Sequence, residues 1–335
     1  MKIAINGFGR IGRCFFRAAT QARLEIVAIN DLGELETLAH LAKYDSTYGE
    51  FNGEIETTDD GLMVNGRMIK FLQEKDPTKL PWKDLDVDLV IESTGVFTEK
   101  EKASAHLEAG ARYVVISAPA KGDDAIKTFV LGVNEENFDP GTDNIMSMAS
   151  CTTNALTPVA KVLNDVFGIE KAMMSTIHSF TMDQVLQDSP HKDPRRARSA
   201  LQSIIPTTTG ATKATCQVIP DLKDKMDGVS FRVPTPTVSL VDFVALLKKD
   251  VTIEEVNGAL TKATEEPKMH GALAVCDEPL VSVDFRGNPN GSIVDLLSTQ
   301  VVGGNLVKVI AWYDNEMGYS FRLAEFCRFL ESKIK

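Results

Sequence analysis

Short apolar runs alternate with amphipathic stretches in the first half of the chain. Residues 2–6 (KIAIN) and 24–30 (LEIVAIN) have the length and composition of buried strands. Between them, residues 13–22 (RCFFRAATQA) repeat their apolar positions at the spacing of a helix face. Further apolar runs at 87–93 and 113–117 predict two more strands. Strands that alternate with helices predict an α/β fold with a doubly wound parallel sheet.

The second half shows longer alternating stretches. Residues 156–168 predict an amphipathic helix with Pro158 in its first turn, where a missing N–H is harmless. Strands are predicted at 171–179, 228–236, 237–249 and 305–316, and a helix ends the chain. The segment 180–203 is polar and has no periodicity. A loop of this length in a compact domain is usually functional.

A glycine-rich turn joins the first strand to the first helix. Residues 7–12 (GFGRIG) follow the strand directly, and Asp31 lies 19 residues after Gly12. Gly7 permits a tight turn, Gly9 lets the backbone approach a pyrophosphate, and Gly12 lets the helix pack on the strand. An acid about 20 residues after such a turn binds the ribose hydroxyls. The order of these features predicts a dinucleotide site.

Short polar residues follow two later strands, at 93–95 (STG) and 117–120 (SAPA). In a doubly wound sheet the carboxyl ends of the strands line the ligand crevice. Ser117 is therefore a candidate contact to the dinucleotide. Ordinary turn chemistry at a strand end explains Ser117 equally well, and both interpretations stay open.

The charge balance narrows the class of partner. The chain holds 36 Lys and Arg and 47 Asp and Glu, a net charge of -11. This balance argues against a broad nucleic-acid surface. No apolar run approaches the roughly 20 residues of a membrane-spanning helix, and the first ten residues lack the features of a signal peptide. We expect a cytoplasmic protein that binds neither membranes nor nucleic acid.

Five cysteines are scattered along the chain without a CxxC pair. This spacing argues against zinc sites and a disulfide framework, and no metal is expected. Four of the cysteines are expected to be small buried side chains: Cys14, Cys216, Cys276 and Cys327.

The fifth cysteine has the setting of a nucleophile. Cys151 stands in SMASCTTNALTP, at or near the start of the helix predicted at 156–168. A helix N-terminus stabilises a thiolate, so the pKa of this thiol is predicted to fall. His178 ends the next predicted strand and is the candidate base, although a capping or core histidine is the alternative. The other four histidines show no sign of a partner in the sequence.

Two groups of residues are suited to anions. Residues 207–210 (TTTG) combine hydroxyls with the N–H groups of a following helix, and three arginines lie in 195–198. Arg232 alternates with apolar neighbours, so it faces a cleft or solvent if they face the core. A thiolate adds to an aldehyde, hydride leaves to a nicotinamide, and a nucleophile releases the resulting thioester. Two anion sites would serve a phosphorylated substrate and a phosphate nucleophile.

Taken together, the motifs resemble the phosphorylating glyceraldehyde-3-phosphate dehydrogenase family over essentially the whole chain. The matching motifs, in order, are INGFGRIGR, KYDS, ISAPAK, ASCTTN, IHSFT, HKDPRRAR, TTTGATKA, FRVPTP and WYDNEMGYS. The resemblance implies NAD as cofactor and glyceraldehyde 3-phosphate and inorganic phosphate as substrates. It also implies a Rossmann-type domain at 1–150 plus 316–335, and an α+β catalytic domain with a mixed, largely antiparallel sheet at 151–315.

The resemblance also implies roles for single residues. Cys151 is the nucleophile and His178 the base. The attacking phosphate is assigned to Ser150, Thr152, Thr209 and Gly210, with Arg196 near both anions. The C3 phosphate is assigned to Thr181, Asp183 and Arg232. The cofactor is assigned to Gly9, Arg10, Ile11, Asp31 and Ser117, with Asn315 on the nicotinamide carboxamide. The segment 180–203 matches a loop that lines a neighbouring subunit's cofactor site, which implies a homotetramer.

Some positions depart from the family pattern. Met148, Phe180 and Met317 replace residues that are usually Asn, Tyr and Trp, and leave room for altered kinetics. Ser189 stands where NAD-specific members often have Leu, and bears on cofactor choice. Erythrose-4-phosphate dehydrogenase is the nearest alternative, but it tends to lack TTTG. Aspartate-semialdehyde dehydrogenase lacks the pair ASCTTN and WYDNE. A non-catalytic dinucleotide- or RNA-binding protein is opposed by the complete set of catalytic positions.

Overall fold

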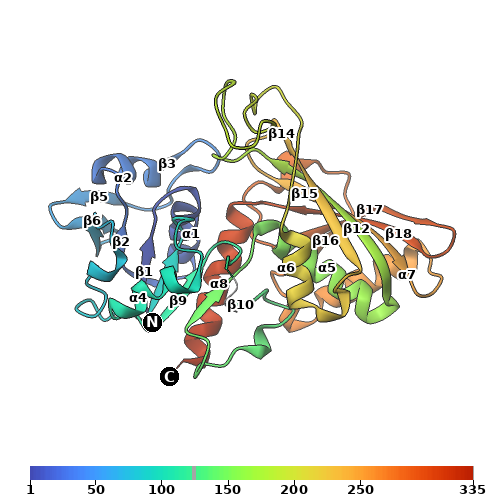
Figure 1. Ribbon diagram of the computed structural model, residues 1–335, viewed down its shortest axis with the longest axis horizontal. Coiled ribbons are helices and arrows are strands. Elements are labelled where there is room, and N and C mark those ends of the chain that lie inside the picture. Colours follow the sequence, from blue (N-terminus) through green and yellow to red (C-terminus); the bar gives the residue numbers. More distant parts are fainter. Residues whose placement is uncertain (123–125, 335) are drawn as a thin grey trace. The chain divides into compact units, whose positions relative to one another are not determined.

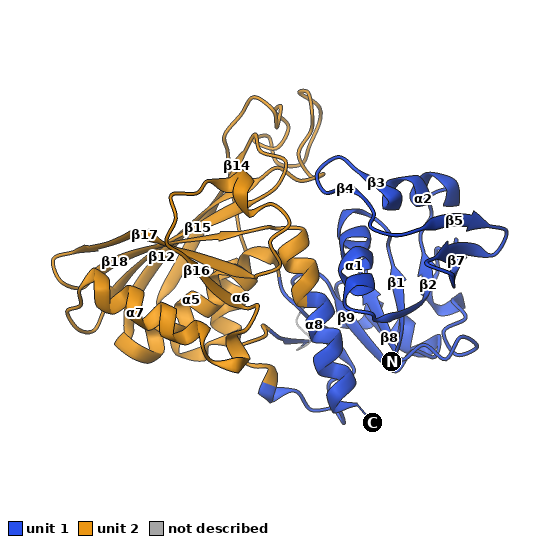
Figure 2. Cartoon of the chain, turned by 180° about the vertical axis from the view of Figure 1, so that it is seen from behind, with its two compact units in different colours: residues 1–129, 136–149, 323–335 blue, residues 130–135, 150–322 orange. Residues whose placement is uncertain are grey.

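The computed structural model describes residues 1–122 and 126–334. The chain divides into two compact units (Figure 2). Unit 1 contains residues 1–129, 136–149 and 323–335, and unit 2 contains 130–135 and 150–322. Lys335, the last residue of the domain range predicted from the sequence, lies outside the described residues.

Unit 1 is built on a sheet whose order within the described residues is β10-β11-β9-β8-β1-β2-β7-β6-β5. Its strands are β1 (Lys2–Asn6), β2 (Glu25–Asn30), β5 (Ile55–Thr58), β6 (Gly61–Val64), β7 (Arg67–Leu72), β8 (Leu89–Glu92), β9 (Tyr113–Ile116), β10 (Lys127–Thr128) and β11 (Ile145–Ser147). In this order, every neighbouring pair between β10 and β7 is parallel. At the other edge, β6 pairs antiparallel with both β7 and β5. The predicted doubly wound parallel sheet is confirmed, with an antiparallel edge added.

The apolar residues of α1 (Arg10–Gln21) explain its place on this sheet. Phe15, Phe16, Ala18 and Ala19 are buried, and Phe16 packs edge-on against Phe8 with ring centroids 5.6 Å apart. The unit also contains α2 (Leu35–Lys43), α3 (Lys100–Ala103), α4 (Ala105–Glu108), η1 (Pro77–Lys79), and the hairpin of β3 (Tyr44–Asp45) and β4 (Gly49–Glu50).

Unit 2 is built on a mixed sheet with the order β13-β14-β12-β15-β18-β17-β16 in its described residues. Its strands are β12 (Ile169–Ser179), β13 (Ile205–Thr207), β14 (Met226–Val233), β15 (Ser239–Leu247), β16 (Leu273–Cys276), β17 (Ser292–Val302) and β18 (Leu306–Tyr313). Two pairs, β12 with β14 and β16 with β17, are parallel, and the other four are antiparallel. The predicted mixed, largely antiparallel sheet is confirmed.

Helices cover one face of this sheet (Figure 1). They are α5 (Cys151–Phe167), α6 (Ala211–Val218) and α7 (Ile253–Thr264), with the short η3 (Pro220–Leu222), η4 (Pro267–Met269) and η5 (Ser282–Phe285). Leu156 and Leu163 of α5 share a buried cluster with Phe243 of β15 and Val309 of β18. Two helices, η2 (Glu135–Asn137) and α8 (Met317–Lys333), cross the division between the units.

One helix boundary differs from the prediction. Helix α5 begins at Cys151, five residues before the predicted start at 156. Pro158 therefore lies inside the helix rather than in its first turn. The residues ahead of it bond locally, because Asn154 Nδ2 donates to Ser150 O at 3.0 Å and Thr157 Oγ1 donates to Thr153 O at 2.6 Å.

The segment 180–203 contains neither helix nor strand, as predicted. Among the four cysteines expected to be buried, Cys14 and Cys327 are buried. The expectation is wrong for Cys216 and Cys276, which are only partly buried. Over the described range, none of the helices combines the length and apolar character needed to cross a membrane.

Candidate active site

Cys151 is the first residue of α5. Ser150 caps the helix, and its Oγ accepts a hydrogen bond from the N–H of Thr153 at 3.1 Å. Ala149, just before the cap, has a φ of 54°, in the left-handed region that residues other than glycine rarely occupy. The turn that presents the thiol is therefore strained, a feature that clusters at functional sites.

The structure brings Cys151 and His178 together. Sγ of Cys151 lies 3.5 Å from Nε2 of His178, and the histidine is buried near the end of β12. The chain thus pairs a thiol at a helix start with an imidazole at a strand end. This is the arrangement of an activated nucleophile and its base.

The other ring nitrogen of His178 faces two competing partners. Nδ1 lies 2.7 Å from the carbonyl oxygen of Ser179 and 2.6 Å from Nη1 of Arg232. His178 and Arg232 are register partners on the parallel strands β12 and β14, which explains their contact. If Arg232 donates to Nδ1, the neutral ring carries its proton on Nε2. If Nδ1 donates to Ser179 instead, Nε2 is free to accept the proton of Cys151.

Burial dominates the titration of this pair. It lowers the pKa of His178 to about 3, and the positive charge of Arg232 adds to the effect. The structure differs from the prediction for Cys151, since burial raises the pKa of the thiol. Arg232 and hydrogen bonds at the helix start, from Thr152 among others, act in the opposite direction. A thiolate at neutral pH therefore depends on a partner that takes up the proton.

Tyr313 contacts the residue that follows the nucleophile and was not identified from the sequence. Its hydroxyl is 2.8 Å from Oγ1 of Thr152 and 2.9 Å from Oγ1 of Thr176. Burial raises the pKa of Tyr313, so it remains a neutral phenol. Thr152, predicted as a phosphate ligand, thus directs its hydroxyl toward Tyr313. The signal was the position of Tyr313 within the motif WYDNE.

A strained turn fixes the end of β12. Val238 has a φ of 67°, an outlier for a β-branched residue. Its carbonyl oxygen accepts a hydrogen bond from Oγ of Ser179 at 2.8 Å, and the N–H of Ser179 donates to Ser239 Oγ at 3.0 Å. Ser239 Oγ in turn donates to Oδ1 of Asn315 at 2.9 Å. The predicted nicotinamide contact, Asn315, is thus linked through Ser239 to Ser179, the residue that follows His178.

The predicted anion residues lie on the segment 180–203 and its neighbours. Arg196 forms an ion pair with Asp183 and donates from Nε and Nη2 to Oγ1 of Thr207, at 2.9 and 2.6 Å. Arg196 and Asp183 both act electrostatically on Arg232, which places the three charges in one cluster. Oδ2 of Asp193 also lies 3.6 Å from Nε of Arg196, so the cluster holds two guanidinium groups and two carboxylates. The forked donors of the guanidinium groups suit an anion.

The remaining anion residues have local partners. The N–H of Thr181 donates to Oε1 of Gln184 at 2.9 Å, and Oγ1 of Thr209 accepts from the N–H of Ala211 at 3.1 Å. Gly210 precedes α6, and open space surrounds the position where its Cβ would be. A helix start with this space exposes N–H groups to an oxyanion.

In unit 1 a cavity of about 400 Å³ lies at the carboxyl ends of the central strands. Its lining residues are Asn6, Gly7, Gly9, Asn30, Asp31, Leu32, Glu74, Lys75, Ser93, Thr94, Val96 and Phe97. Gly7 has a φ of +95°, and a Cβ there would lie 2.7 Å from the backbone nitrogen of Thr94. A Cβ on Gly12 would lie 2.1 Å from Gly7 O, whereas Gly9 faces open space. These contacts agree with the tight turn and close backbone packing expected of a dinucleotide-binding turn.

Asp31 lines this cavity. Its Oδ2 accepts from the N–H of Phe8 at 2.6 Å and its Oδ1 from the N–H of Gly33 at 2.9 Å. These bonds fix the carboxylate and leave lone pairs for ribose hydroxyls. The cavity and this acid fit an adenosine ribose.

The other predicted cofactor residues are placed differently. Arg10 forms an ion pair with Asp45 at 2.5 Å, and Ile11 is half-buried in the first turn of α1. Oγ of Ser117 donates to the carbonyl oxygen of Glu92 at 3.0 Å, which matches the turn interpretation. None of these three residues lines the cavity. In the part of the chain that the structure describes, no group of three metal-ligating side chains occurs.

Comparison with known proteins covers both units. The C-terminal domain of glyceraldehyde 3-phosphate dehydrogenase matches residues 150–315, and the NAD binding domain matches residues 1–100. The chain is 54% identical over 334 residues to the glyceraldehyde-3-phosphate dehydrogenase of Geobacillus stearothermophilus, with 99% of each chain covered. It is 52% identical to glyceraldehyde-3-phosphate dehydrogenase 1 of Bacillus subtilis over the same share, and 54% identical to the Clostridium acetobutylicum enzyme over 96% of each chain.

These matches confirm the resemblance, the activity and the cofactor that the sequence motifs predicted. They also favour the enzyme over the non-catalytic alternative, because the relatives match over 99% of the chain. The chain is therefore an NAD-dependent enzyme and belongs to the glyceraldehyde-3-phosphate dehydrogenase family.

Proposed function

We propose that this enzyme converts D-glyceraldehyde 3-phosphate to 1,3-bisphosphoglycerate with NAD and inorganic phosphate, and that Cys151 is its covalent nucleophile. The observation that carries this proposal is the 3.5 Å contact between Sγ of Cys151 and Nε2 of His178 at the start of α5. A neutral imidazole beside a buried thiol is the group that can take its proton.

In the first step, the thiol proton passes to Nε2 of His178 while Sγ forms a bond to the aldehyde carbon. The imidazolium is then held by the hydrogen bond from Nδ1 to the carbonyl oxygen of Ser179. The proton returns to the developing alkoxide, and the product is a hemithioacetal on Cys151. Tyr313 and Thr152 stay neutral in this step and hold the first turn of α5 in place.

In the second step, His178 takes the hydroxyl proton of the hemithioacetal as its C1 hydrogen leaves as hydride. NAD, when bound, supplies the acceptor of that hydride. The result is a thioester on Cys151. A phosphate oxygen then bonds to the thioester carbon, the carbon–sulfur bond breaks, and the thiolate recovers a proton from His178.

Arg232 couples substrate binding to the base. Its Nη1 contacts Nδ1 of His178 and also donates to Ser179 O at 3.1 Å. The C3 phosphate of the substrate draws the guanidinium away, because a dianion binds it more strongly than a neutral ring does. Nδ1 is then left to Ser179, which is the state in which Nε2 accepts the thiol proton.

We assign the two anion sites as the family motifs imply. Thr181, Asp183 and Arg232 serve the C3 phosphate. Ser150, Thr152, Thr209 and Gly210 serve inorganic phosphate, with Thr152 acting through its backbone because its hydroxyl contacts Tyr313. Arg196 serves both, since Asp183 and Thr207 fix its orientation.

For the cofactor, Gly9, Arg10 and Ile11 serve the pyrophosphate, Asp31 the adenosine ribose, and Asn315 the nicotinamide carboxamide. Ser117, which follows β9, is assigned to the cofactor from the sequence motif. The functional domains in this proposal are 1–150 plus 316–335 for the cofactor and 151–315 for catalysis. NAD is preferred over NADP because Asp31 repels a 2′-phosphate.

The enzyme works as a homotetramer in the cytoplasm. Support comes from apolar side chains that the isolated subunit leaves exposed in and near the segment 180–203. Met182, Leu186, Leu201 and Ile204 are each more than half exposed. Large exposed apolar side chains in one segment are typical of a protein interface.

The test is the absorbance of NADH formed from glyceraldehyde 3-phosphate with and without inorganic phosphate. Sustained turnover that requires phosphate supports the proposal. Erythrose 4-phosphate serves as the competing substrate, and a higher kcat/KM for it without phosphate would favour erythrose-4-phosphate dehydrogenase instead.

A further inference from the structure

Polar residues end three neighbouring strands of unit 1. Glu92, Asn6 and Asn30 are the last residues of β8, β1 and β2, and they are register partners across the sheet. All three side chains are buried, with Glu92 and Asn6 each only 1% exposed. The apolar strands thus end in a row of polar groups that no step of the mechanism uses.

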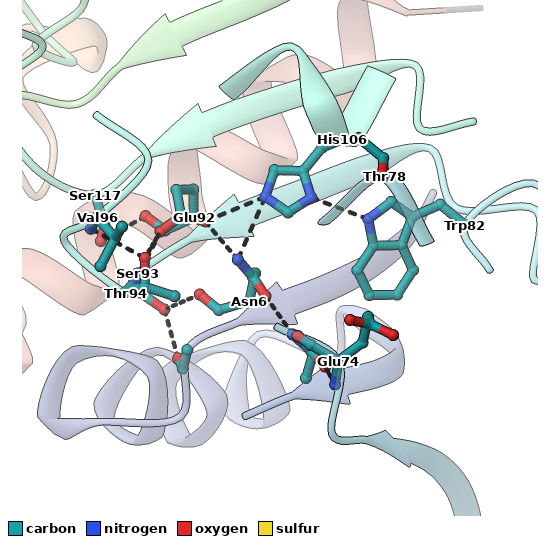
Figure 3. Close-up of polar contacts among 12 residues, drawn as sticks. Asn6, Glu74, Thr78, Trp82, Glu92, Ser93, Thr94, Val96, His106 and Ser117 are labelled. Atoms are coloured by element: carbon teal, nitrogen blue, oxygen red, sulfur yellow. Dashed lines mark hydrogen bonds and ion pairs between the residues drawn. The ribbon is translucent and has the colours of Figure 1, made fainter. Parts of the chain in front are cut away.

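The carboxylate of Glu92 is the centre of this row (Figure 3). Its Oε2 accepts from Nδ2 of Asn6 at 2.6 Å and lies 3.2 Å from Nε2 of His106. Its Oε1 accepts from the N–H of Thr94 at 2.8 Å and from the hydroxyl of the same residue. A buried carboxylate needs such donors, because losing one leaves desolvated charge unpaired.

Trp82 fixes the protonation of His106. Its indole nitrogen, which can only donate, lies 3.1 Å from Nδ1 of His106. Nδ1 is therefore the unprotonated nitrogen, and the ring proton is on Nε2, where it points at Glu92. Trp82 and His106 are both 0% exposed. His106, for which the sequence showed no partner, therefore connects a buried indole to a buried carboxylate.

The same logic fixes the two asparagines. Because Nδ2 of Asn6 donates to Glu92, its Oδ1 is the atom that accepts from Nδ2 of Asn30, at 2.7 Å. Oδ1 of Asn30 then accepts from the N–H of Glu74 at 2.9 Å, and Nδ2 donates to the carbonyl oxygen of Glu74 at 2.9 Å. Donation thus converges on the carboxylate of Glu92 from both sides. On one side it runs from the indole through His106, and on the other from the N–H of Glu74 through Asn30 and Asn6.

This network ends at the wall of the cofactor cavity. Asn6, Asn30, Glu74 and Thr94 line the cavity, whereas Trp82, His106 and Glu92 lie behind it. Thr94 also holds the backbone that follows it, since its Oγ1 accepts a hydrogen bond from the N–H of Val96 at 3.1 Å. The backbone beside Thr94 is also the surface against which Gly7 packs.

We propose that Trp82, His106 and Glu92 are positioning residues for NAD binding. They hold the segment 93–97 on one side of the cavity, and through Asn6 and Asn30 they hold the backbone of Glu74 on the other. The inference rests on the proposed cofactor site in this cavity. It predicts that removing one indole N–H, on a residue that does not line the cavity, weakens the binding of NAD.

The test replaces Trp82 with Phe, which keeps a buried ring and removes the N–H. Trp312→Phe is the matched control, because the only other indole of the chain also donates to a carboxylate, Oδ2 of Asp295 at 3.3 Å, in unit 2. NAD affinity is measured by calorimetry, so the loss of tryptophan fluorescence does not interfere. The kinetic readouts are the KM for NAD, the KM for glyceraldehyde 3-phosphate, and kcat at saturating NAD.

We expect Trp82→Phe to raise the Kd and KM for NAD roughly fivefold to twentyfold, the effect of a lost hydrogen bond in a buried network. The KM for glyceraldehyde 3-phosphate and the kcat at saturating NAD stay within about twofold of wild type. Trp312→Phe leaves NAD affinity unchanged. A Trp82→Phe enzyme that melts at a lower temperature but binds NAD as tightly as wild type would overturn the proposal, since the network would then be structural only.

Two further variants keep the test decisive. If Trp82→Phe does not fold, Thr94→Val removes the hydroxyl bonds to Glu92 and to the N–H of Val96, and full NAD affinity in that variant overturns the proposal. Asp31→Ala separates this inference from the proposed site. If Asp31→Ala weakens NAD binding and Trp82→Phe does not, the cofactor site stands and the positioning role fails; if neither does, both fail.

Discussion

Nη1 of Arg232 lies 2.6 Å from Nδ1 of His178, on the ring nitrogen opposite the one that faces Cys151. The residue proposed to bind the substrate phosphate is therefore also a partner of the proposed base. The contact follows from the parallel register of β12 and β14, which sets the two residues side by side. Arg232 is thereby a link between the substrate and the protonation of His178.

Removing Arg232 separates phosphorylated from unphosphorylated substrates. We expect Arg232→Ala to raise the KM for glyceraldehyde 3-phosphate by about a hundredfold or more, because a charge-assisted bidentate contact is lost. Unphosphorylated glyceraldehyde has no C3 phosphate and is affected much less. Steady-state kinetics with both aldehydes measure the difference, and an equal loss for both would show that Arg232 is structural.

His178 makes stability depend on pH. Its pKa is about 3 in the folded protein and 6.5 in its ordinary state. Between these values the unfolded chain binds the proton and the folded chain does not, so stability is lost as pH falls from about 6.5 toward 3. By pH 5 this one group removes about 2 kcal/mol of unfolding free energy.

His178→Asn removes this contribution, since asparagine does not titrate. Urea unfolding at pH 7 and pH 5, at one protein concentration, measures the difference in free energy. We expect the wild-type protein to lose more stability over this interval than the variant. Identical losses would mean that His178 accepts a proton freely in the folded state.

His178→Asn also tests whether His178 activates the thiol of Cys151. Because burial raises the pKa of the Cys151 thiol, its reaction with iodoacetamide needs a group that takes the proton. His178→Asn is expected to slow alkylation of Cys151 at pH 7 at least about tenfold. Peptide mapping identifies the modified cysteine. Buried Cys14 and Cys327 stay unmodified in the folded enzyme and serve as internal controls.

Cofactor preference tests the role of Asp31. A 2′-phosphate beside this carboxylate is repelled, and Leu32, Gly33 and Glu34 supply no compensating cation. Ser189 is the opposing feature, because it is small and polar where NAD-specific relatives often have Leu. We expect kcat/KM for NAD to exceed that for NADP by at least about tenfold, or 1.4 kcal/mol. Equal kcat/KM values for NAD and NADP would show that Ser189, rather than Asp31, determines the cofactor preference.

Local patterns predicted the strands, the glycine turn and the catalytic motifs because each depends on residues close in sequence. The partners of Arg232 depend on which strands are neighbours, and alternation showed only that its side chain points away from Phe231 and Val233. The start of α5 was placed late because Thr152, Thr153 and Asn154 interrupt the apolar pattern, although they are buried in the helix.

The row of Asn6, Asn30 and Glu92 was missed for a related reason. Each is a single polar residue at the end of an apolar strand, and only the parallel register brings the three together. The signal was present in the recurrence of one polar residue at the end of successive buried strands. It becomes specific once the strand order is known.

The covalent role of Cys151 is the central claim, and a single-turnover reaction without phosphate tests it most directly. Mixing enzyme, NAD and glyceraldehyde 3-phosphate should give one burst of NADH per subunit and then stop, because the thioester has no phosphate to release it. Mass spectrometry of the quenched enzyme should find the 3-phosphoglyceroyl group on the peptide that contains Cys151, and phosphate should remove it. Cys151→Ser should show neither burst nor adduct. Steady NADH formation without phosphate, or an adduct on any residue other than Cys151, would contradict the account.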